Sequence, residues 1–306
     1  MPERPIVITN PRSGAARAEK ALSVLARHSL PQGRPEILRT EYAGHAVEIA
    51  RRISSSCPLV IVVGGDGTIN EVVNGLMAAV ARPRPLPPIG LIPIGTANVL
   101  ARELGIPTNL TGAMRVLTGG KTRKMDLGVA RFCAKPGSRR TTRYFPCMAG
   151  AGFDAEVARA YHATRGRKSY AHLYLLPMLK TLGNFALPKI RVMVDGDEVA
   201  ASACSVVVGN ARSYGTLFPV AARARPDDGL LDACVFTSRT LRDFIRVVLN
   251  VLVGRHIGCR EVRYRVGRHI SLTSDDAVPV QLDGDFAGHL PLQLDVKPNA
   301  LTFFVP

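Results

Sequence analysis

The sequence predicts a two-domain α/β protein, with a parallel, doubly wound sheet in the N-terminal domain and a β-rich antiparallel sandwich in the C-terminal domain. Three observations support this fold class. Short apolar strands alternate with helical patterns through residue 124. Three of those strands run directly into turns with glycine that open a helix. Beyond residue 124, alternating strand patterns and hairpin signals replace most of the helices. We therefore place a domain boundary near Met125.

The stretch 59–77 organises the N-terminal domain. Its first five residues, LVIVV, form a short buried strand, and apolar residues recur at helical spacing from Ile69 onwards. The turn between them, GGDGT, leaves N–H groups unpaired at a helix N-terminus and lets a bulky anion approach the backbone. An aspartate in such a turn suits a cation that lies between it and a phosphate. We interpret the loop as a nucleotide-phosphate and Mg²⁺ site; a plain tight turn is the alternative.

The other N-terminal elements repeat this order of strand, loop and helix. Because ligands of doubly wound sheets bind at the carboxyl ends of the strands, the loops should lie around one cleft. The patterns predict strands at 5–9, 36–40 and 89–94, and helices at 15–28, 44–54, 99–104 and 110–117.

The C-terminal part alternates as β-strands do. Two Asp-Gly-Asp triplets, at 195–197 and 283–285, are hairpin signals. Two helical insertions interrupt the strands, at about 161–185 and 241–253. Strands are predicted at 125–132, 144–149, 189–194, 203–208, 230–236, 270–273 and 278–282.

Composition narrows the class of partner. The 306 residues carry a net charge of +16, which favours an anionic partner: nucleic acid, an anionic membrane surface or a phosphorylated ligand. Aromatic residues make up only 6%, Trp is absent and no zinc-finger spacing occurs, so we expect no nucleic acid. No apolar segment reaches the roughly 20 residues that span a bilayer. The six scattered cysteines favour a reducing compartment, and no signal peptide is apparent. We expect a cytoplasmic protein that associates peripherally with membranes.

Seven motifs occur in one order along nearly the whole chain. They are NPRSG (10–14), TEYAGHA (40–46), GGDGTINEVVNGL (64–76), PIGTAN (93–98), AGAGFDAEV (149–157), PDDGLLD (226–232) and QLDGD (281–285). Together they resemble the diacylglycerol kinase catalytic family of bacterial soluble lipid kinases and their sphingosine and ceramide kinase relatives. GGDGT alone is also found in NAD kinases and phosphofructokinase-like enzymes.

The resemblance implies a lipid kinase that uses ATP and Mg²⁺. Residues 1–124, joined by a last strand at about 295–306, would bind the nucleotide in an NAD kinase/diacylglycerol kinase-like fold, and 125–294 would bind the lipid. A structural Mg²⁺ site carries over to Asp228 with the carbonyls of Arg225 and Leu230. The nucleotide contacts carry over to Asn10, Pro11, Arg12, Ser13, Gly14, Thr40, Gly64, Gly65, Asp66, Gly67, Thr68, Ile69, Asn70 and Thr96.

Two residues are the predicted catalytic pair. Asp66 handles Mg²⁺ and phosphate, and it can otherwise be a residue that stabilises its own turn. Asp285 takes the place of the Glu in the family's DGE triplet, as the general base for the lipid hydroxyl. Its alternative is an ordinary hairpin carboxylate, with Asp283 as the second candidate for the base. The chain also departs from the family's GTxND motif, since it reads GTANV at 95–99 and so lacks the final Asp.

Further polar residues also have two interpretations. Thr68 and Asn70 can donate to phosphates, and Thr68 can cap the helix. We leave Glu71 undecided between a role facing the second domain and the charge pattern of its helix. The carboxylates of Asp227, Asp228 and Asp232 are dense enough to favour a cation, with a solvated loop as the alternative.

Basic runs in the second domain suggest contact with an anionic membrane. They occur at 139–143, 165–168 and 255–268, and a further run at 121–124 lies just before the domain boundary. The predicted helix at 170–187 combines apolar residues with the neighbouring run at 165–168, which suits an interfacial helix, although a core helix is as good an interpretation.

The leading hypothesis is an ATP- and Mg²⁺-dependent kinase that phosphorylates a hydroxyl of a membrane lipid. Diacylglycerol, a sphingoid base, ceramide and another glycerolipid all stay open as the acceptor. The alternatives are an NAD-kinase-like enzyme, and a catalytically silent lipid-binding module in which Asp285 no longer acts. A homodimer is compatible with the sequence, which leaves the oligomeric state open.

Overall fold

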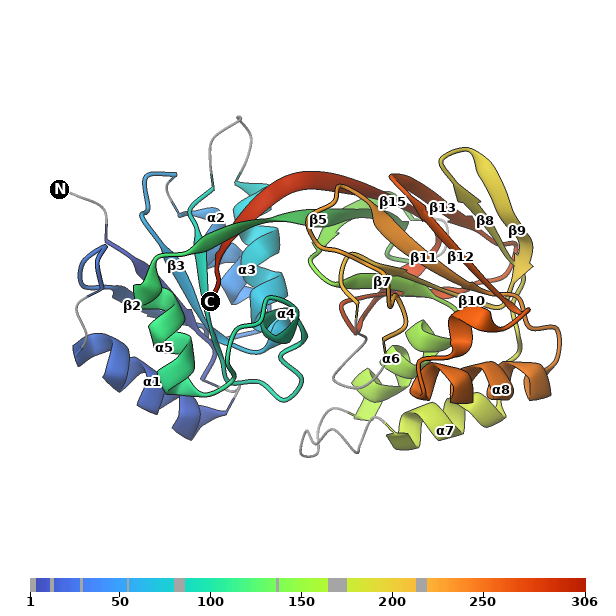
Figure 1. Ribbon diagram of the computed structural model, residues 1–306, viewed down its shortest axis with the longest axis horizontal. Coiled ribbons are helices and arrows are strands. Elements are labelled where there is room, and N and C mark those ends of the chain that lie inside the picture. Colours follow the sequence, from blue (N-terminus) through green and yellow to red (C-terminus); the bar gives the residue numbers. More distant parts are fainter. Residues whose placement is uncertain are drawn as a thin grey trace. The chain divides into compact units, whose positions relative to one another are not determined.

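The computed structural model describes residues 4–11, 14–27, 30–53, 55–79, 86–135, 138–164, 175–212 and 219–306. The chain forms two compact units, which are described separately below (Figure 1). Unit 1 consists of Met1–Met125 and Asn299–Pro306, and unit 2 of Asp126–Pro298.

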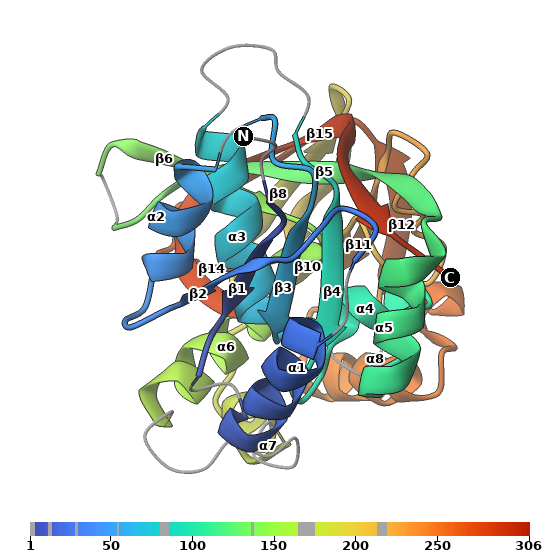
Figure 2. The ribbon, with the colours of Figure 1, turned by 90° about the vertical axis from the view of Figure 1, so that its left-hand side faces the viewer.

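Unit 1 contains a parallel sheet with the strand order β4-β3-β1-β2 (Figure 2). In register, Thr9 of β1 lies opposite Val63 of β3, and Gly64 lies opposite Pro93 of β4. The carboxyl ends of the four strands therefore meet at one edge of the sheet, as the sequence predicts. The strands are β1 (Ile6–Thr9), β2 (Glu36–Arg39), β3 (Val60–Gly64) and β4 (Ile89–Pro93).

Helices cover both faces of this sheet, which makes it doubly wound (Figure 1). On one face, Leu22 and Leu25 of α1 and Leu117 of α5 pack with Ile61 of β3 in one core. On the other face, α3 packs against α2 so closely that a Cβ on Gly75 would lie 2.4 Å from the carbonyl oxygen of Val47. The helices are α1 (Ala15–Arg27), α2 (His45–Arg51), α3 (Asp66–Ala78), α4 (Val99–Glu103) and α5 (Leu110–Gly119).

Unit 2 is mainly antiparallel β. One run of paired strands is β12-β11-β10-β7-β14-β15, and a second is β9-β8-β13-β15; β5 pairs with β15 and β6. Side chains of both runs, such as Val206, Val235, Val192 and Leu272, share one apolar core. The strands, of which β5 begins in unit 1 and β15 ends there, are β5 (Thr122–Cys133), β6 (Arg140–Phe145), β7 (Met148–Ala151), β8 (Ile190–Val194), β9 (Asp197–Ala203), β10 (Ser205–Gly209), β11 (Leu231–Phe236), β12 (Val262–Gly267), β13 (His269–Thr273), β14 (Pro279–Leu282) and β15 (Asp285–Phe304).

Among the described residues of unit 2, three helices and a 3₁₀ turn interrupt these strands: α6 (Phe153–Thr164), α7 (Leu175–Gly183), α8 (Leu241–Leu252) and η2 (His256–Gly258). The helical insertion predicted at about 161–185 was placed too late in the chain, because α6 begins at Phe153. The described residues of this segment form two helices, α6 and α7, and not one. Gly152, at φ 95°, turns the chain from β7 directly into that helix. Residues 165–174, including the first part of the helix predicted at 170–187, lie outside the described residues. Among the residues that are described, no helix is long and apolar enough to cross a bilayer.

The last strand is much longer than the predicted segment. β15 begins in unit 2 at Asp285 and ends in unit 1, where Phe303 pairs in parallel with Ile89 of β4. Leu290, Leu292 and Leu294 are buried and alternate with polar residues, as in a half-buried strand, but Pro291 and Pro298 have no N–H to donate to a neighbouring strand and so count against one continuous strand.

Candidate active site

In unit 1, the loops that follow β3 and β4 touch through glycines. A Cβ on Gly95 would lie 2.6 Å from Cα of Gly65, and a Cβ on Gly65 would lie 3.1 Å from Cα of Gly95. Gly64 has no room for a side chain either, since a Cβ there would lie 2.7 Å from Cβ of Thr68. Gly65 and Gly95 are thus required for backbone to pack on backbone at the edge where the strands end. At Gly67, by contrast, a Cβ would meet nothing within 4 Å, so the backbone there is open.

Asp66 joins these two loops. Its Oδ1 accepts a hydrogen bond from the backbone N–H of Leu100, at 3.2 Å, in the first turn of α4. Burial raises the pKa of Asp66, and bonds from backbone N–H groups partly oppose that rise. Within the second loop, Asn98 takes a left-handed φ of 50° and donates from Nδ2 to the carbonyl of Gly95 at 3.0 Å. Asp66 therefore fixes the second loop, in addition to any contact with phosphate.

Several predicted nucleotide residues direct their side chains into the fold. Thr68, Ile69 and Asn70 are buried in the first turn of α3. The Oδ1 of Asn70 accepts a bond from Asn74 at 3.1 Å. The backbone of the loop at 64–67, rather than these side chains, is thus the part of the motif suited to phosphate.

The remaining predicted nucleotide residues follow the other strands. Asn10 and Pro11 come directly after β1, and Gly14 precedes α1. Thr40 follows β2 and donates its backbone N–H to Thr9 at 2.9 Å, and Thr96 is exposed in the loop after β4. Arg12 and Ser13 lie outside the described residues.

Glu71, left undecided from the sequence, connects two motifs. Its Oε1 accepts a bond from the backbone N–H of Gly44 at 3.1 Å, at the start of α2. Gly44 has φ 87°, a conformation that side chains other than glycine's rarely adopt. Glu71 therefore ties the TEYAGHA loop to α3.

In unit 2, Asp283 and Gly284 form the two-residue turn between β14 and β15. Both have positive φ, 50° and 85°, as a type I′ hairpin requires, and Leu282 pairs with Asp285 across it. The carboxylate of Asp283 accepts the backbone N–H groups of Cys147 and Met148, at 3.0 and 2.9 Å. Asp283 is thus committed to holding the turn on β7, and Asp285, half-buried at the start of β15, is the better candidate for the base.

A second set of bonds reaches this turn from α6. Gln281 accepts the N–H of Gly284 at 2.7 Å and donates from Nε2 to Oδ2 of Asp154 at 2.9 Å. Burial raises the pKa of Asp154 from 3.8 to about 6. Asp154 belongs to the AGAGFDAEV motif and Gln281 to the QLDGD motif, but no pattern in a single sequence indicates that the two residues meet.

The PDDG loop is held by a carboxylate that the sequence analysis missed. Asp126, buried, accepts the N–H of Gly229 at 2.6 Å and donates its own N–H to the carbonyl of Pro226 at 2.7 Å. Asp228 accepts the N–H of Leu230 at 3.1 Å, and Asp232 accepts the hydroxyl of Tyr264 at 2.7 Å.

The described residues contain no cluster of three or more Asp, Glu, His or Cys side chains suited to a metal ion. A cation at the PDDG loop would therefore depend on Asp228 together with main-chain carbonyls, such as those of Arg225 and Leu230. Such an all-oxygen donor set fits the chemistry of Mg²⁺.

Comparison with protein families accounts for both units. The model of the diacylglycerol kinase catalytic domain matches residues 4–130, and that of the YegS C-terminal NAD kinase beta sandwich-like domain matches residues 147–305. The chain belongs to the diacylglycerol kinase family. It is a lipid kinase, a phosphotransferase, as the motif series predicts, and the silent lipid-binding module is set aside.

Named relatives of this lipid kinase match over almost their full length. A diacylglycerol kinase of Staphylococcus carnosus is 28% identical over 295 residues, covering 95% of this chain and 91% of that protein. One of Bacillus subtilis is 28% identical over 292 residues, covering 94% and 92%.

Solved structures support the fold. A diacylglycerol kinase from Bacillus anthracis has a TM-score of 0.70 at 21% identity, covering 99% of this chain and 97% of that one. Yeast NADH kinase, solved with NADH, has a TM-score of 0.55 at 13% identity, covering 100% and 84%. The NAD-kinase-like alternative is therefore a likeness of fold, and the family places the chain among the lipid kinases.

Proposed function

We propose that this lipid kinase transfers the γ-phosphate of ATP, with Mg²⁺, to the free hydroxyl of diacylglycerol in a membrane. The observation that carries the proposal is the loop that opens α3, where Gly67 is exposed and a Cβ on it would meet nothing within 4 Å, so that an anion can approach the backbone. The relatives in S. carnosus and B. subtilis are named diacylglycerol kinases, which supports diacylglycerol as the acceptor.

The nucleotide phosphates would lie against the loops that end the parallel strands. The loop at 64–67 opens α3, a helix of 13 residues, so its N-terminal N–H groups favour negative charge. Asp66 keeps the loop after β4 against the first loop through Leu100. Phosphoryl transfer depends mainly on positioning and charge neutralisation, which is what a rigid pair of backbone loops supplies.

Asp285 would accept the proton of the lipid hydroxyl as the oxygen attacks the γ-phosphate. The new bond joins that oxygen to phosphorus, the bond to the β-phosphate oxygen breaks, and ADP leaves. Asp283 is a poorer base because its carboxylate already accepts two backbone N–H groups. When bound, Mg²⁺ neutralises charge on the phosphates; Asp66 is our candidate for contact with that ion, and Asp228 for a structural one.

The decisive experiment uses purified full-length protein with γ-labelled ATP and a panel of lipids in mixed micelles. We expect label in phosphatidic acid from diacylglycerol, loss of labelling when Mg²⁺ is chelated, and no labelled NADP from NAD. Preferential labelling of ceramide or a sphingoid base would mean that this lipid, and not diacylglycerol, is the acceptor. Labelling of NAD in place of any lipid would overturn the proposal.

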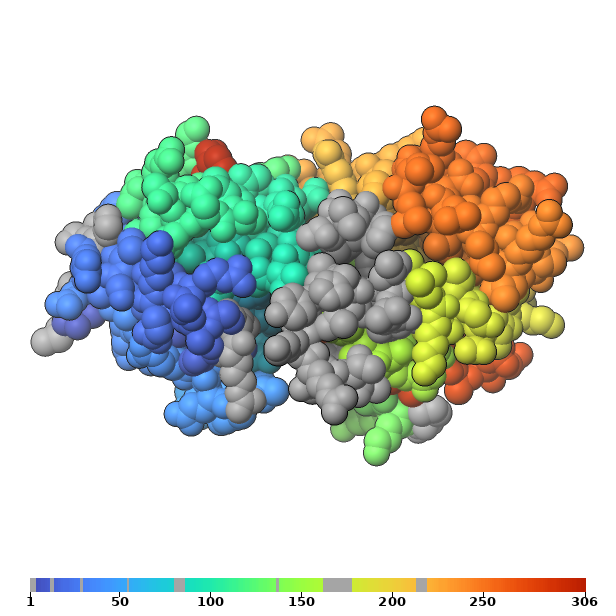
Figure 3. All heavy atoms as spheres, turned by 90° about the horizontal axis from the view of Figure 1, so that it is seen from below, coloured from blue at the N-terminus to red at the C-terminus, as the bar shows by residue number. Residues whose placement is uncertain are grey.

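A lipid acceptor requires contact with a bilayer, and we propose that α8 provides part of it. Its buried face carries Phe244, Val247 and Val251. Near its C-terminal end, Leu249 and Leu252 are 57% and 43% exposed, and Val253, which follows the helix, is 66% exposed. Residues 240–253, orange in Figure 3, belong to a surface of unit 2. Arg239, Arg242 and Arg255 are exposed on and beside the helix. Exposed apolar residues beside arginines suit an anionic lipid surface.

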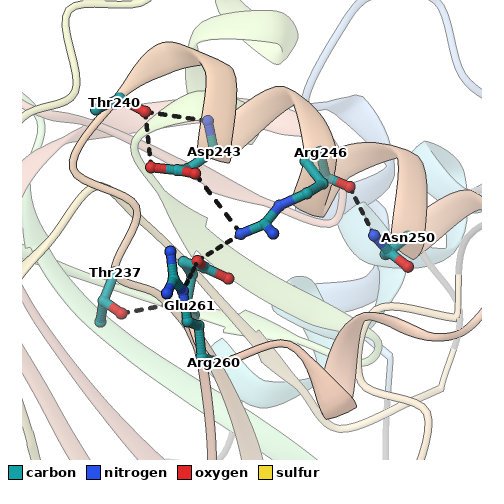
Figure 4. Close-up of polar contacts among 7 residues, drawn as sticks. All are labelled: Thr237, Thr240, Asp243, Arg246, Asn250, Arg260 and Glu261. Atoms are coloured by element: carbon teal, nitrogen blue, oxygen red, sulfur yellow. Dashed lines mark hydrogen bonds and ion pairs between the residues drawn. The ribbon is translucent and has the colours of Figure 1, made fainter.

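Polar contacts hold α8 in this orientation (Figure 4). Thr240 caps the helix by accepting the N–H of Asp243 at 3.1 Å. Arg246 reaches from the helix to Glu261 at 2.5 Å, and Arg260 bonds the same oxygen at 2.7 Å. The hydrogen bond from Arg260 lowers the pKa of Glu261, which favours its charged form. The helix is thus fixed with one apolar face in the core and another outward.

The test is sedimentation with vesicles of phosphatidylcholine, with and without phosphatidylglycerol. We expect binding to the anionic vesicles that falls steeply with salt, and a large loss in Leu249→Ser/Leu252→Ser. Val266→Ser, at a 44% exposed residue of β12, is the matched control. Binding that ignores both salt and the α8 substitutions would remove α8 from this role, and a dimer broken by them would assign the face to a second copy of the chain.

A further inference from the structure

The bonds from α6 to the Asp283–Gly284 turn form a chain of three groups. The carboxylate of Asp154 accepts from Nε2 of Gln281 at 2.9 Å, and Oε1 of Gln281 accepts from the N–H of Gly284 at 2.7 Å. An ionised carboxylate can only accept, so Asp154 determines which end of the Gln281 amide faces it. The other end, the carbonyl, then necessarily faces Gly284. Asp154 thus acts on the turn without touching it.

The glycine at position 150 of β7 makes room for this carboxylate. Gly150 of β7 lies directly opposite Gln281 of β14 in the sheet. A Cβ on Gly150 would lie 1.8 Å from Oδ2 of Asp154, so any other residue would displace the carboxylate. Gln281 is completely buried, and Oδ1 of Asp154 is buried with no hydrogen-bond partner among the described residues. Burial of an ionised carboxylate costs stability even with the backbone N–H groups of Ala155 and Asp154 beside it, which makes a purely stabilising purpose a poor explanation.

A second hairpin in unit 2 demonstrates that the turn itself does not need these bonds. Asp195-Gly196-Asp197 joins β8 and β9 with the same two-residue loop, at φ 50° and 94°. Asp195 accepts the N–H groups of Arg268 and His269, at 2.9 and 2.8 Å, as Asp283 does on β7. At the position that corresponds to Gln281, two residues before the turn, stands Met193. The hairpin therefore forms with an apolar side chain there.

We propose that Asp154 is a positioning residue that, through Gln281, holds the Asp283–Gly284 turn and so keeps Asp285 in place for phosphoryl transfer. The inference rests on the proposed role of Asp285. It predicts that Asp154 and Gln281 act as one unit, and that their loss changes the rate of transfer while leaving the binding of ATP unchanged. Asp154 itself touches neither substrate.

The test is a double-mutant cycle in full-length protein with ATP and diacylglycerol in mixed micelles. Gln281→Met copies the residue of the second hairpin, and Asp154→Ala removes the anchor. We expect each to lower kcat about tenfold with the KM for ATP unchanged, and the double variant to lose no more than either single variant. Asp154→Asn, which can still present an oxygen to Gln281, should restore most of kcat. Additive losses, or kcat unchanged in both single variants, would overturn the proposal.

Amide hydrogen exchange gives a readout that does not depend on activity. Exchange at Gly284 should rise roughly fivefold in Asp154→Ala as well as in Gln281→Met, while exchange at Gly196 stays unchanged. Equal exchange at Gly284 in wild type and Asp154→Ala would overturn the relay. Failure of the proposed function would give a different result, because wild-type protein would then label no lipid. The hydrogen exchange at Gly284 would still test the bonds from Asp154 and Gln281.

Discussion

The two Asp-Gly-Asp hairpins of unit 2 have the same sequence and nearly the same backbone, yet their surroundings differ. In both, the first aspartate has φ 50°, its N–H donates to a neighbouring strand at 2.8 Å, and its carboxylate accepts two backbone N–H groups. The triplet at 195–197 is exposed, whereas that at 283–285 is half-buried.

The two turns differ in the side chains that form hydrogen bonds to them. Gln281 and Asp154 hold the second turn, and Met193 stands where Gln281 would be in the first. The local motif therefore builds a turn, and only its setting in the tertiary structure makes one copy a candidate site. Because the pair is so well matched, each residue of one turn has its own control in the other.

The largest difference should appear at the third residue of each triplet. Asp285→Asn removes the proposed base and should lower kcat roughly a thousandfold, since general bases contribute about 10²–10⁴-fold. Asp197→Asn, the same change in the exposed hairpin, should leave kcat as in wild type. Thermal melting of both variants controls for folding. Full activity in Asp285→Asn would mean that another residue is the base, and that the two hairpins do not differ in function.

The pH dependence of stability should reveal the buried support of one turn. The pKa of Asp154 is raised from 3.8 to about 6, so the folded protein keeps this proton over a range in which the unfolded chain releases it. This group therefore lowers the free energy of unfolding as pH rises from about 4 to 6, by up to about 3 kcal/mol. Asp154→Asn should lack that loss.

Denaturant titrations of the two proteins between pH 4 and 7 measure this effect. The stability of Asp154→Asn relative to wild type should increase with pH over the window and then level off above it. A difference that does not change with pH would mean that Asp154 is not buried as described.

Truncation of the first aspartate should destabilise the second hairpin more than the first. Asp283→Ala leaves two part-buried backbone N–H groups without their carboxylate partner, at a cost of about 1–3 kcal/mol, whereas in Asp195→Ala water can replace the exposed carboxylate and the cost should be smaller. Chemical denaturation measures this cost. Only Asp283→Ala should also lower kcat, because only that turn carries the proposed base. Equal kinetic effects would show that general loss of stability, not the site, controls the rate.

The smallest expected effect is at the glycines. Gly284 and Gly196 have φ of 85° and 94°, so alanine at either position costs about 1–2 kcal/mol of strain. The two alanine variants should lose similar stability in urea melts. Gly284→Ala should in addition raise hydrogen exchange around Asp285, and a matching response around Asp197 in Gly196→Ala would weaken the claim that the two turns differ.

Much of unit 1 was predictable because its signals are local. Apolar runs such as 59–63 and the glycine turns after them fixed the strand and helix order, and the parallel strands then brought their loops to one edge. Unit 2 was less predictable. The start of α6 at Phe153 depends on packing rather than periodicity, and β15 keeps its alternation but runs through Pro291 and Pro298, which count against a strand of 20 residues.

Site residues divide in the same way. Glycine motifs identified the loops at 64–67 and 95–98 from the sequence, but the bonds of Asp66 to Leu100 and of Glu71 to Gly44 join residues far apart in the chain. Asp126 gave no signal, since it stands alone within a strand pattern and meets the PDDG loop only in the folded unit.

The sequence by itself determined the family, the order of the elements and the two loops suited to phosphate, because glycine, proline and apolar spacing act over a few residues. Only the tertiary structure decided which of two identical Asp-Gly-Asp turns is supported by Gln281 and Asp154. The reason is physical: a hydrogen bond between residues 127 positions apart depends on where the strands and helices pack, and no local pattern encodes that meeting.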